Sequence, residues 1–506
     1  MTATPSFADW GGKPAIVMGT GGVTTFAELE TESNRFARLF RRLGLNAGDV
    51  LAVCVENRPE FLQAACAAMR SGLTFVPISA KLTAAEIAFI VVDSGAKALL
   101  TSPGIGDTFP TLPSLLTKIT LVSIGPARPG FTSWPDERTD LPAAPIADEA
   151  VGSEMLYSSG TTGRPKGIRY RTRPGEAAGV TESVLSAFRM LDVDGGVIYL
   201  CPAPLYHSAP YGWSMATLLL GGTVVVMERF DPEEALALIE RHRVTISQWV
   251  PTHFVRLLKL PDSTRAHYDL SSLRLAVHAA APCPVPVKRA MIDWFGPILL
   301  EYFGSSEQTA LTFIGSAEWL EHPGSVGRCV FGTLHICDDA GEPVAPGTIG
   351  QIHSDGAADF FYHNDPVKTA RARNGRGWST VGDLGYLDED GYLFLTDRKG
   401  FMIITGGVNV YPQEIENLLV THPRVADAGV IGLPDADLGE RVTAVIQPLD
   451  MADATPGFAR ELDAWLRRQL SSVKAPKRII FRAELPRLPT GKMVKHVLRE
   501  QVMASE

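Results

Sequence analysis

The sequence lacks the features of a disulfide-rich, zinc-binding or membrane-spanning protein. Its 506 residues include six cysteines, and none of them has the C-x-x-C spacing of a zinc or redox site. We therefore expect reduced, structural thiols. The sequence also has no uninterrupted run of about 18 apolar residues, and its first residues show no basic segment followed by an apolar run. These absences predict a cytoplasmic protein with no integral membrane segment.

Positive charge is also scarce. The 47 lysines and arginines are outnumbered by 56 acidic residues, which gives a formal net charge of −9. General nucleic-acid binding needs a basic face, so we expect no nucleic-acid partner. The hydrophobic fraction of 45% and the charged fraction of 20% are ordinary for a soluble globular protein. A chain of this length exceeds one hydrophobic core, so at least two domains are expected, and a homodimer remains open.

The first part of the chain alternates helix and strand signals. Apolar residues at helical spacing predict helices over 31–44 and 59–72, and short apolar runs predict strands over 49–55 and 74–78. Thr83-x-x-Glu86 has the spacing of a capping box at the start of a further helix. This alternation predicts an α/β fold with parallel sheets covered by helices.

The pattern changes towards the C-terminal end. From Gly341 onward, short strand-like runs separated by Gly, Asp and Pro turns predict an antiparallel β subdomain. An α+β pattern follows Arg398–Gly400, with helices predicted over 412–420 and 459–470. We therefore predict a large N-terminal domain over residues 1–397 and a small C-terminal domain over residues 398–506.

The segment Tyr157–Gly167 combines small residues, hydroxyls and one lysine in a loop. Glycines let backbone N–H groups approach phosphate oxygens, and hydroxyls add donors or a contact to magnesium. The loop differs from the common P-loop, because Pro165 precedes Lys166 and Gly167 follows it. It indicates ATP binding, with a Ser/Gly-rich surface linker as the alternative. Its candidate ligands are Ser158, Ser159, Gly160, Thr161, Thr162, Gly163 and Lys166.

Four further segments carry groups suited to a nucleotide. The segment 301–307 offers aromatic rings that could stack on a purine and Glu307, a carboxylate that could hold magnesium. Asp383, between two glycines, could accept both hydroxyls of a ribose, and Arg398 offers a cation for phosphate or ribose. Lys492 lies on a Pro/Gly loop. Taken singly, each has a plainer explanation, namely a buried aromatic residue, a turn-capping aspartate, a surface turn and a solvated lysine.

Taken together, these motifs resemble the adenylate-forming superfamily. The resemblance rests on Tyr157-Ser-Ser-Gly-Thr-Thr-Gly-Arg-Pro-Lys-Gly, Phe303-Gly-Ser-Ser-Glu307, Gly382-Asp383, Asp397-Arg398-Lys and Pro489-Thr-Gly-Lys492, in this order. It covers nearly the whole chain. Members include acyl-CoA synthetases, the adenylation domains of nonribosomal peptide synthetases and beetle luciferases. The segment 405–416 looks most like the fatty-acid and aryl-acid CoA ligases.

The resemblance implies a reaction in two halves with ATP, Mg²⁺ and coenzyme A as co-substrates. A carboxylate attacks the α-phosphorus of ATP and releases pyrophosphate; the thiol of coenzyme A then displaces AMP. Lys492 is expected to contact the attacking carboxylate and the α-phosphate, lowering their repulsion. Glu307 is expected to hold magnesium, together with Ser158 or another hydroxyl of the loop. Lys166 then serves on the pyrophosphate side.

Further roles follow from the same resemblance. Phe303 is expected to stack on adenine and Asp383 to bind the ribose with support from Arg398. The superfamily commonly has Gly-Gly or Gly-Ala before Pro282, where this chain has alanines, and threonine where it has Ser306. The remaining ATP contacts that the resemblance implies are Ala280, Ala281, Pro282, Tyr302, Gly304, Ser305 and Ser306.

Between the two halves the C-terminal domain is expected to swing as a body. Lys399 and Gly400 would form the hinge, and Gly406 and Gly407 would move towards coenzyme A.

The acid itself is expected to contact the segment 204–213. His207 matches an aromatic or histidine gate in relatives, with a core histidine as the alternative, and Tyr211 and Trp213 supply aromatic walls. This segment has no aspartate for an α-ammonium group, which favours an apolar monocarboxylic acid, whether fatty, aryl-alkanoic or steroid-type. The alternatives are a stand-alone adenylation enzyme that loads a carrier protein and a noncatalytic binding protein.

Overall fold

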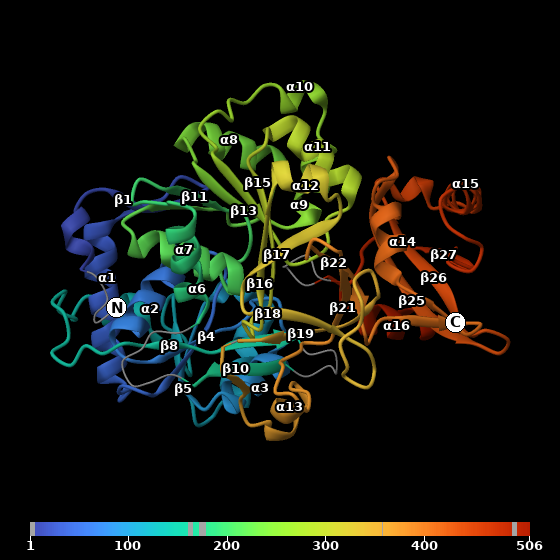
Figure 1. The fold of residues 1–506 in the computed structure, drawn as a ribbon. Coiled ribbons are helices and arrows are strands. Elements are labelled where there is room, and N and C mark those ends of the chain that lie inside the picture. Colours follow the sequence, from blue (N-terminus) through green and yellow to red (C-terminus); the bar gives the residue numbers. More distant parts are fainter. Residues whose placement is uncertain (1–5, 160–164, 172–178, 357, 488–492, 506) are drawn as a thin grey trace.

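The computed structural model describes residues 6–159, 165–171, 179–356, 358–487 and 493–505. The N-terminal part forms a parallel sheet in the order β7-β6-β5-β3-β4-β8 (Figure 1). Its strands are β3 (Val50–Cys54), β4 (Thr74–Pro77), β5 (Ala96–Thr101), β6 (Thr120–Ser123), β7 (Thr132–Ser133) and β8 (Ser153–Glu154). The helices of this part are α1 (Phe26–Arg42), α2 (Pro59–Arg70), α3 (Ala84–Asp93), α4 (Leu112–Leu115) and α5 (Trp134–Arg138), with the 3-10 turns Phe7–Trp10 and Pro103–Thr111.

The helix boundaries follow the capping residues. Thr83 caps α3 and forms the predicted capping box with Glu86. A second capping box, formed by Thr25 and Glu28, starts α1 at Phe26, which is earlier than the predicted range 31–44. The prediction began too late because it relied on the apolar spacing from Phe36 onward, and the polar run Glu30–Asn34 separates that spacing from the buried Phe26 and Leu29 of the first turns.

A second, larger sheet runs through the centre of the molecule. Its order is β18-β19-β21-β22-β17-β16-β15-β14-β13-β11-β12-β1-β2. The pairs from β1 through β12, β11, β13 and β14 to β15 are parallel, whereas β15 pairs with β16 in antiparallel orientation. The antiparallel strands that were predicted from Gly341 onward therefore begin already with the β15–β16 hairpin, and they extend the parallel sheet instead of standing apart from it.

The strands of this sheet are β1 (Pro14–Met18), β2 (Val23–Thr25), β11 (Ile198–Cys201), β12 (Thr223–Val226), β13 (Ile246–Trp249), β14 (Leu275–His278), β15 (Leu299–Gly304), β16 (Leu311–Gly315), β17 (Ser325–Phe331), β18 (Thr333–Cys337), β19 (Gly350–Asp355), β21 (Asp383–Leu387) and β22 (Leu393–Arg398). The helices in the same part of the chain are α6 (Val180–Met190), α7 (Ser208–Leu219), α8 (Pro232–His242), α9 (Pro251–Leu258), α10 (Asp262–Arg265), α11 (Val285–Phe295), α12 (Ser316–Glu321) and α13 (Pro366–Arg371).

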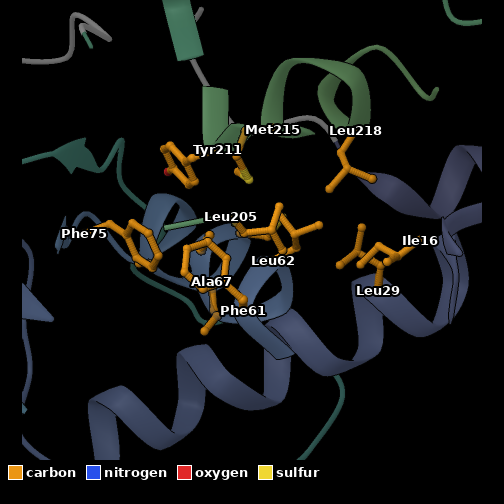
Figure 2. Packing of buried hydrophobic residues seen from close by; sticks show 14 of the residues in the cluster. Ile16, Leu29, Phe61, Leu62, Ala67, Phe75, Leu205, Tyr211, Met215 and Leu218 are labelled. Atoms are coloured by element: carbon orange, nitrogen blue, oxygen red, sulfur yellow. The ribbon is translucent and has the colours of Figure 1, made fainter. Parts of the chain in front are cut away.

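The largest hydrophobic core joins the two sheets. Figure 2 shows Phe61 of α2, Phe75 of β4 and Tyr211 of α7 packed against one another. The rings of Phe75 and Tyr211 are stacked with centroids 5.3 Å apart, and Phe61 meets Phe75 edge-on at 5.6 Å. All three side chains are fully buried. These contacts fix α7 against the first sheet, so that the start of α7 has a defined position.

A small antiparallel sheet holds the two ends of the predicted phosphate loop. Its order is β20-β10-β9, with β9 (Leu156–Ser159), β10 (Pro165–Tyr170) and β20 (Phe360–Tyr362). The connection from β9 to β10 contains residues 160–164, which lie outside the described part of the chain.

A separate sheet follows Arg398, where β22 ends. It runs β24-β23-β26-β25, with β27 beside β26. Its strands are β23 (Ile403–Thr405), β24 (Val408–Val410), β25 (Val425–Asp435), β26 (Gly439–Pro448) and β27 (Arg478–Phe481); a 3-10 turn spans Met451–Asp453, and the helices are α14 (Pro412–Leu419), α15 (Pro456–Arg467) and α16 (Lys495–Met503). These elements form the orange and red part at the right of Figure 1.

The architecture confirms the predicted α/β class with a small α+β part at the C-terminal end. Within the described residues, we find no helix with the length and apolar character needed to span a bilayer.

Candidate active site

Two cavities meet near the C-terminal ends of the central strands. The first, of about 760 Å³, is lined by residues from both N-terminal sheets and from the small β20-β10-β9 sheet. The second, of about 750 Å³, lies between the central sheet and the C-terminal sheet. The residues that line both cavities are Val250, Ala280, Tyr302, Gly304 and Arg398. The cavities are therefore adjacent, and a ligand that spans this wall would contact both.

The flanks of the phosphate loop line the first cavity. Ser158 and Lys166 are directly opposite each other in the β9–β10 ladder, and both contribute to the cavity wall. The backbone of Ser159 pairs with Pro165 in the same ladder. The strands thus bring the two ends of the loop together at the cavity. Four of the predicted phosphate ligands lie outside the described residues: Gly160, Thr161, Thr162 and Gly163.

Lys166 and Glu307 are connected through Tyr362, a residue that the sequence did not single out. The Lys166 ammonium lies 4.9 Å from the centroid of the Tyr362 ring. The Tyr362 hydroxyl donates a hydrogen bond of 2.9 Å to Oε1 of Glu307. Burial and the nearby Lys368 lower the pKa of Lys166 to about 8. The loop lysine and the predicted magnesium ligand therefore belong to one cluster.

Glu307 is suited to a nucleotide-bound Mg²⁺. The residue is buried, lines the first cavity and has one carboxylate oxygen engaged by Tyr362. Among the described residues, no group of three or more His, Cys, Asp or Glu side chains could hold a metal by itself. This agrees with the coordination of Mg²⁺ on ATP, which takes one or two carboxylates together with phosphate oxygens and water.

The segment before Glu307 forms the wall between the cavities. Tyr302 and Gly304 line both cavities, and Phe303 lines the second. Ser305 and Ser306 line the first, and the Ser306 carbonyl accepts a hydrogen bond from the Tyr170 hydroxyl. The structure thus brings every predicted residue of this segment to the two cavities.

The segment that was expected to lie across the adenine site from Phe303 is at the second cavity. Ala280, Ala281 and Pro282 follow β14 and line the second cavity together with Phe303. Ala280 has a backbone φ of 79°, which is uncommon for a residue other than glycine. This conformation explains physically why a glycine would suit the position.

Asp383 and Arg398 form an ion pair at the junction. Asp383 Oδ1 lies 2.7 Å from Arg398 Nε, and the two residues are opposite each other in the β21–β22 ladder. Asp383 lines the second cavity and Arg398 lines both. The arginine fixes the carboxylate at the edge of the cavity, where it could accept hydrogen bonds from a ribose.

His207 and Trp213 line the first cavity, as expected. His207 is the N-cap residue of α7, and its Nε2 atom is buried without a hydrogen-bond partner in the described structure. Burial lowers its pKa to about 3, so the imidazole is neutral near pH 7. Tyr211, which was expected to face the acid, is instead part of the hydrophobic core against Phe75 and does not line this cavity. Nearly all of α7 is buried, so its apolar spacing could not distinguish a core-facing ring from a cavity-facing one.

The residues on both sides of the predicted lysine loop reach the second cavity. Arg487 and Met493 form an antiparallel bridge and both line this cavity. Nη2 of Arg487 donates to Oδ1 of Asp427 over 2.7 Å, which fixes one end of the loop. Lys492 itself lies outside the described residues.

The remaining predicted residues lie away from the cavities. Gly406 and Gly407 form the exposed turn between β23 and β24, with φ of 56° and 77°. Lys399 pairs with Asp339 over 2.7 Å. A Cβ atom added at Gly400 would have no neighbour within 4 Å in the described structure. The predicted hinge therefore follows directly after the Asp383–Arg398 pair in a loosely packed turn.

Sequence reasoning missed several cavity residues. Gln248 lines the first cavity at the end of β13, and its Oε1 atom is buried without a partner in the described structure. Tyr362, which ends β20 and lines the first cavity, and Lys368, which lies in α13 next to this strand, belong to none of the recognised motifs. Their only signal would have been the pairing of β10 with β20, which is not visible in the sequence.

Comparison with known proteins gives a consistent result. The sequence model of the AMP-binding enzyme family matches residues 5–360, and that of the AMP-binding enzyme C-terminal domain matches residues 414–492. A feruloyl-CoA synthase of Amycolatopsis sp is 33% identical over 485 residues, covering 95% of this chain and 94% of the relative. The medium/long-chain-fatty-acid–CoA ligase FadD8 of Mycobacterium tuberculosis is 30% identical over 514 residues, covering 96% of this chain and 87% of the relative. Among solved structures, the amide bond synthetase McbA from Marinactinospora thermotolerans superimposes with a TM-score of 0.82 at 27% identity, covering 98% of both chains.

Proposed function

The chain belongs to the AMP-binding enzyme family, and we propose that it is an ATP-dependent acid:CoA ligase acting on an apolar monocarboxylic acid. CoA ligases of this superfamily use ATP, Mg²⁺ and coenzyme A as co-substrates. The observation that carries the proposal is the shared wall of the two cavities at Ala280, Tyr302, Gly304 and Arg398. A nucleotide at this wall would place its phosphates towards Lys166 and its ribose towards Asp383.

The first half-reaction follows from this placement. The acid carboxylate attacks the α-phosphorus of ATP, the bond to the β-phosphate oxygen breaks, and pyrophosphate leaves. Both reactants are anions, so the site has to neutralise charge and hold the reacting atoms close together. Lys166 lies on the phosphate side, and Arg487 and Met493 would bring Lys492 to the α-phosphate from the second cavity. Bound Mg²⁺ would neutralise the phosphates, held by Glu307 with Ser158 nearby.

The second half-reaction requires access for a thiol. The sulfur of coenzyme A attacks the acyl carbon and AMP leaves with the bonding electrons. In our proposal residues 398–506 move as one body about Lys399 and Gly400, which carries Lys492 away and brings Gly406 and Gly407 towards the acyl-adenylate. The exposed turn at Gly406–Gly407 and the open surroundings of Gly400 are compatible with this motion.

An apolar acid is favoured by the walls of the first cavity. Its apolar lining includes Ile78, Leu82, Ile90, Val184, Ala187, Met190, Leu311, Phe313, Val330 and Phe331. These side chains would gain free energy by burying an apolar substrate body. The neutral His207 and the indole of Trp213 add a few polar groups to this surface.

Amino acids are disfavoured because the acidic side chains of the first cavity already have partners. Glu182 pairs with Arg189 over 3.4 Å and Asp359 with Arg171 over 3.1 Å. The third, Glu307, accepts the hydrogen bond of Tyr362 and lies on the phosphate side. An α-ammonium group would therefore lose its hydration without gaining a dedicated counter-ion.

The proposal is tested by incubating the protein with ATP, Mg²⁺, coenzyme A and a panel of carboxylic acids. AMP should form only with an acid of the right class, and mass spectrometry should detect the matching thioester. If an acyl product appears only when a phosphopantetheinyl carrier protein is supplied, the enzyme is a carrier-loading adenylation enzyme instead. Absence of AMP across a broad panel would favour a noncatalytic binding protein.

The role of Lys492 is tested by separating the half-reactions. Lys492→Ala should lose adenylate formation in pyrophosphate exchange by about 100-fold or more, yet convert a chemically prepared acyl-adenylate to the thioester. Lys477→Ala is a matched control, because Lys477 is an exposed lysine of the same C-terminal part and its ammonium donates to the Ser472 carbonyl at 2.7 Å. Equal loss of both half-reactions in Lys492→Ala would contradict the assigned role.

A further inference from the structure

Strand pairing places the start of α13 beside Lys166. In the β10–β20 ladder Ile168 is opposite Tyr362, and the His363 N–H then donates to the Gly167 carbonyl over 2.8 Å. The chain continues from this pair through Asn364 and Asp365 into α13. The residue preceding Gly167 on β10 is Lys166, so the first turn of α13 lies close to the phosphate loop.

Two local interactions fix Lys368 in that first turn. The side chain of Asp365 caps α13 and accepts a hydrogen bond of 2.8 Å from the Lys368 backbone N–H. Thr369 Oγ1 accepts a hydrogen bond of 2.9 Å from the Tyr362 N–H, which ties the helix to β20. Tyr362 is also the residue whose ring centroid lies 4.9 Å from the Lys166 ammonium. The helix turn that carries Lys368 is therefore tied, through Thr369, to the tyrosine that Lys166 contacts.

This placement brings the side chain of Lys368 near enough to Lys166 to act on it, because Lys368 is, after burial, the largest influence that lowers the pKa of Lys166. Two neighbouring ammonium groups repel each other, and this repulsion adds to the effect of burial on the pKa of Lys166. Two acidic groups, Glu307 and Asp365, act on the pKa of Lys166 in the opposite direction and raise it. A polyanion between the two ammonium groups would remove the repulsion, which makes this pair suited to bind a diphosphate.

We propose that Lys368 is a second cation of the phosphate site, which binds the β- and γ-phosphates of ATP, and the pyrophosphate product, together with Lys166. This inference rests on the proposed function for the location of the triphosphate. No recognised motif contains Lys368, which lies about 200 residues after the loop in sequence and reaches it only through the β10–β20 pairing. The alternative is a purely structural lysine that supports the start of α13.

The test measures the binding of magnesium pyrophosphate to the full-length protein by calorimetry. Lys368→Ala should weaken this binding by about tenfold or more, in line with the loss of a charge-assisted hydrogen bond. Lys368→Arg should keep most of the affinity for magnesium pyrophosphate, because the arginine retains the positive charge. In pyrophosphate exchange the KM for ATP should rise in Lys368→Ala while the KM for the acid stays the same. Circular dichroism and the melting temperature check that each variant is folded.

Arg371→Ala is the matched control. Arg371 is an exposed cation on the same helix, so its removal changes the net charge equally without touching the lysine pair. Unchanged pyrophosphate binding in Lys368→Ala, or an equal loss in Arg371→Ala, would overturn the proposal. If Lys368→Ala unfolds, Lys368→Gln replaces it, and a Lys368→Gln protein that binds pyrophosphate as tightly as the wild type would likewise overturn it.

The outcome is separable from that of the proposed function. Pyrophosphate binding needs neither an acid nor coenzyme A, so it can be measured in a protein that forms no thioester. Loss of binding in Lys368→Ala, with no thioester from any acid, would support the lysine pair and contradict the ligase. Normal thioester formation by the wild type, together with unchanged pyrophosphate binding in Lys368→Ala, would support the ligase and contradict the lysine pair.

Discussion

Asp383 and Arg398 face each other across the β21–β22 ladder and are joined by an ion pair of 2.7 Å between Oδ1 and Nε. The side chain of Asp383 is 12% exposed and that of Arg398 is 32% exposed. Arg398 also lines both cavities, whereas Asp383 lines only the second. The pair therefore presents one oriented carboxylate at the place where the cavities meet, directly before the predicted hinge.

We predict that Asp383→Asn weakens ATP binding without affecting the acid. The amide keeps the shape of the side chain but offers one acceptor oxygen instead of two and leaves the charge of Arg398 uncompensated. The KM for ATP in pyrophosphate exchange should rise by about 10- to 100-fold, with little change in the KM for the acid. Glu389→Gln is the control, because Glu389 is exposed in the turn after β21. An unchanged KM for ATP would exclude the ribose role.

A second prediction concerns the hinge. Gly400→Pro removes rotation about one backbone bond at the proposed pivot, so thioester formation should slow by about tenfold or more while adenylate formation persists. No backbone hydrogen bond from the Gly400 N–H is found in the described structure, so the proline does not remove one.

Gly400→Ala is the control for this hinge experiment. Gly400 does not have a positive φ, and an added Cβ atom meets nothing within 4 Å among the described residues. The alanine variant should therefore be nearly as active as the wild type in both half-reactions. Equal losses of adenylate and thioester formation in the proline variant would contradict the hinge.

The sequence predicts the components of the site better than their connections. Loop residues, Asp383 and Arg398 stand out because glycine, hydroxyl and charged residues cluster locally along the chain. The β10–β20 pairing that brings Tyr362 and Lys368 to Lys166 depends on contacts across about 200 residues, and no local pattern reports them.

Tyr211 illustrates a second limit of sequence reasoning. The helix α7 is buried on nearly all sides, so its sequence is apolar both on the face towards the core and on the face towards the cavity. The pattern of apolar residues therefore cannot tell which aromatic ring lies on which face. Trp213 reaches the cavity and Tyr211 reaches Phe75, and only the packing distinguishes them.

Glu154 provides a prediction about pH. Its carboxylate is buried beside the start of α6, where it accepts a hydrogen bond of 2.8 Å from the Val180 N–H and another from the Thr181 hydroxyl. Burial raises its pKa from 4.5 to about 7. Between these values the folded protein holds a proton that the unfolded chain has lost, so the free energy of unfolding should fall as pH rises.

Glu154→Gln tests this pH dependence, because glutamine has the same shape and does not ionise. From pH 4.5 to 7 the melting temperature of the wild type should fall relative to that of the variant, corresponding to at most about 3 kcal/mol. Glu484→Gln, at an exposed position, should instead follow the wild type. Parallel melting curves for wild type and Glu154→Gln across this range would show that Glu154 does not hold a proton in the folded state.

The last prediction uses two neighbouring alanines of the adenine wall as a matched pair. Ala280 has a φ of 79°, whereas Ala281 is not among the described residues with positive φ. An L-residue in the left-handed region costs about 1–2 kcal/mol, while glycine costs roughly 0.5–1 kcal/mol of extra backbone entropy. Ala280→Gly should therefore stabilise the protein by up to about 1 kcal/mol, and Ala281→Gly should destabilise it by roughly 0.5–1 kcal/mol.

For a cooperative unit of several hundred residues, these free energies correspond to shifts in melting temperature of roughly 1 °C in opposite directions, which differential scanning calorimetry can resolve. Shifts of the same sign would show that relief of backbone strain at Ala280 does not outweigh the entropy that glycine adds to the unfolded chain.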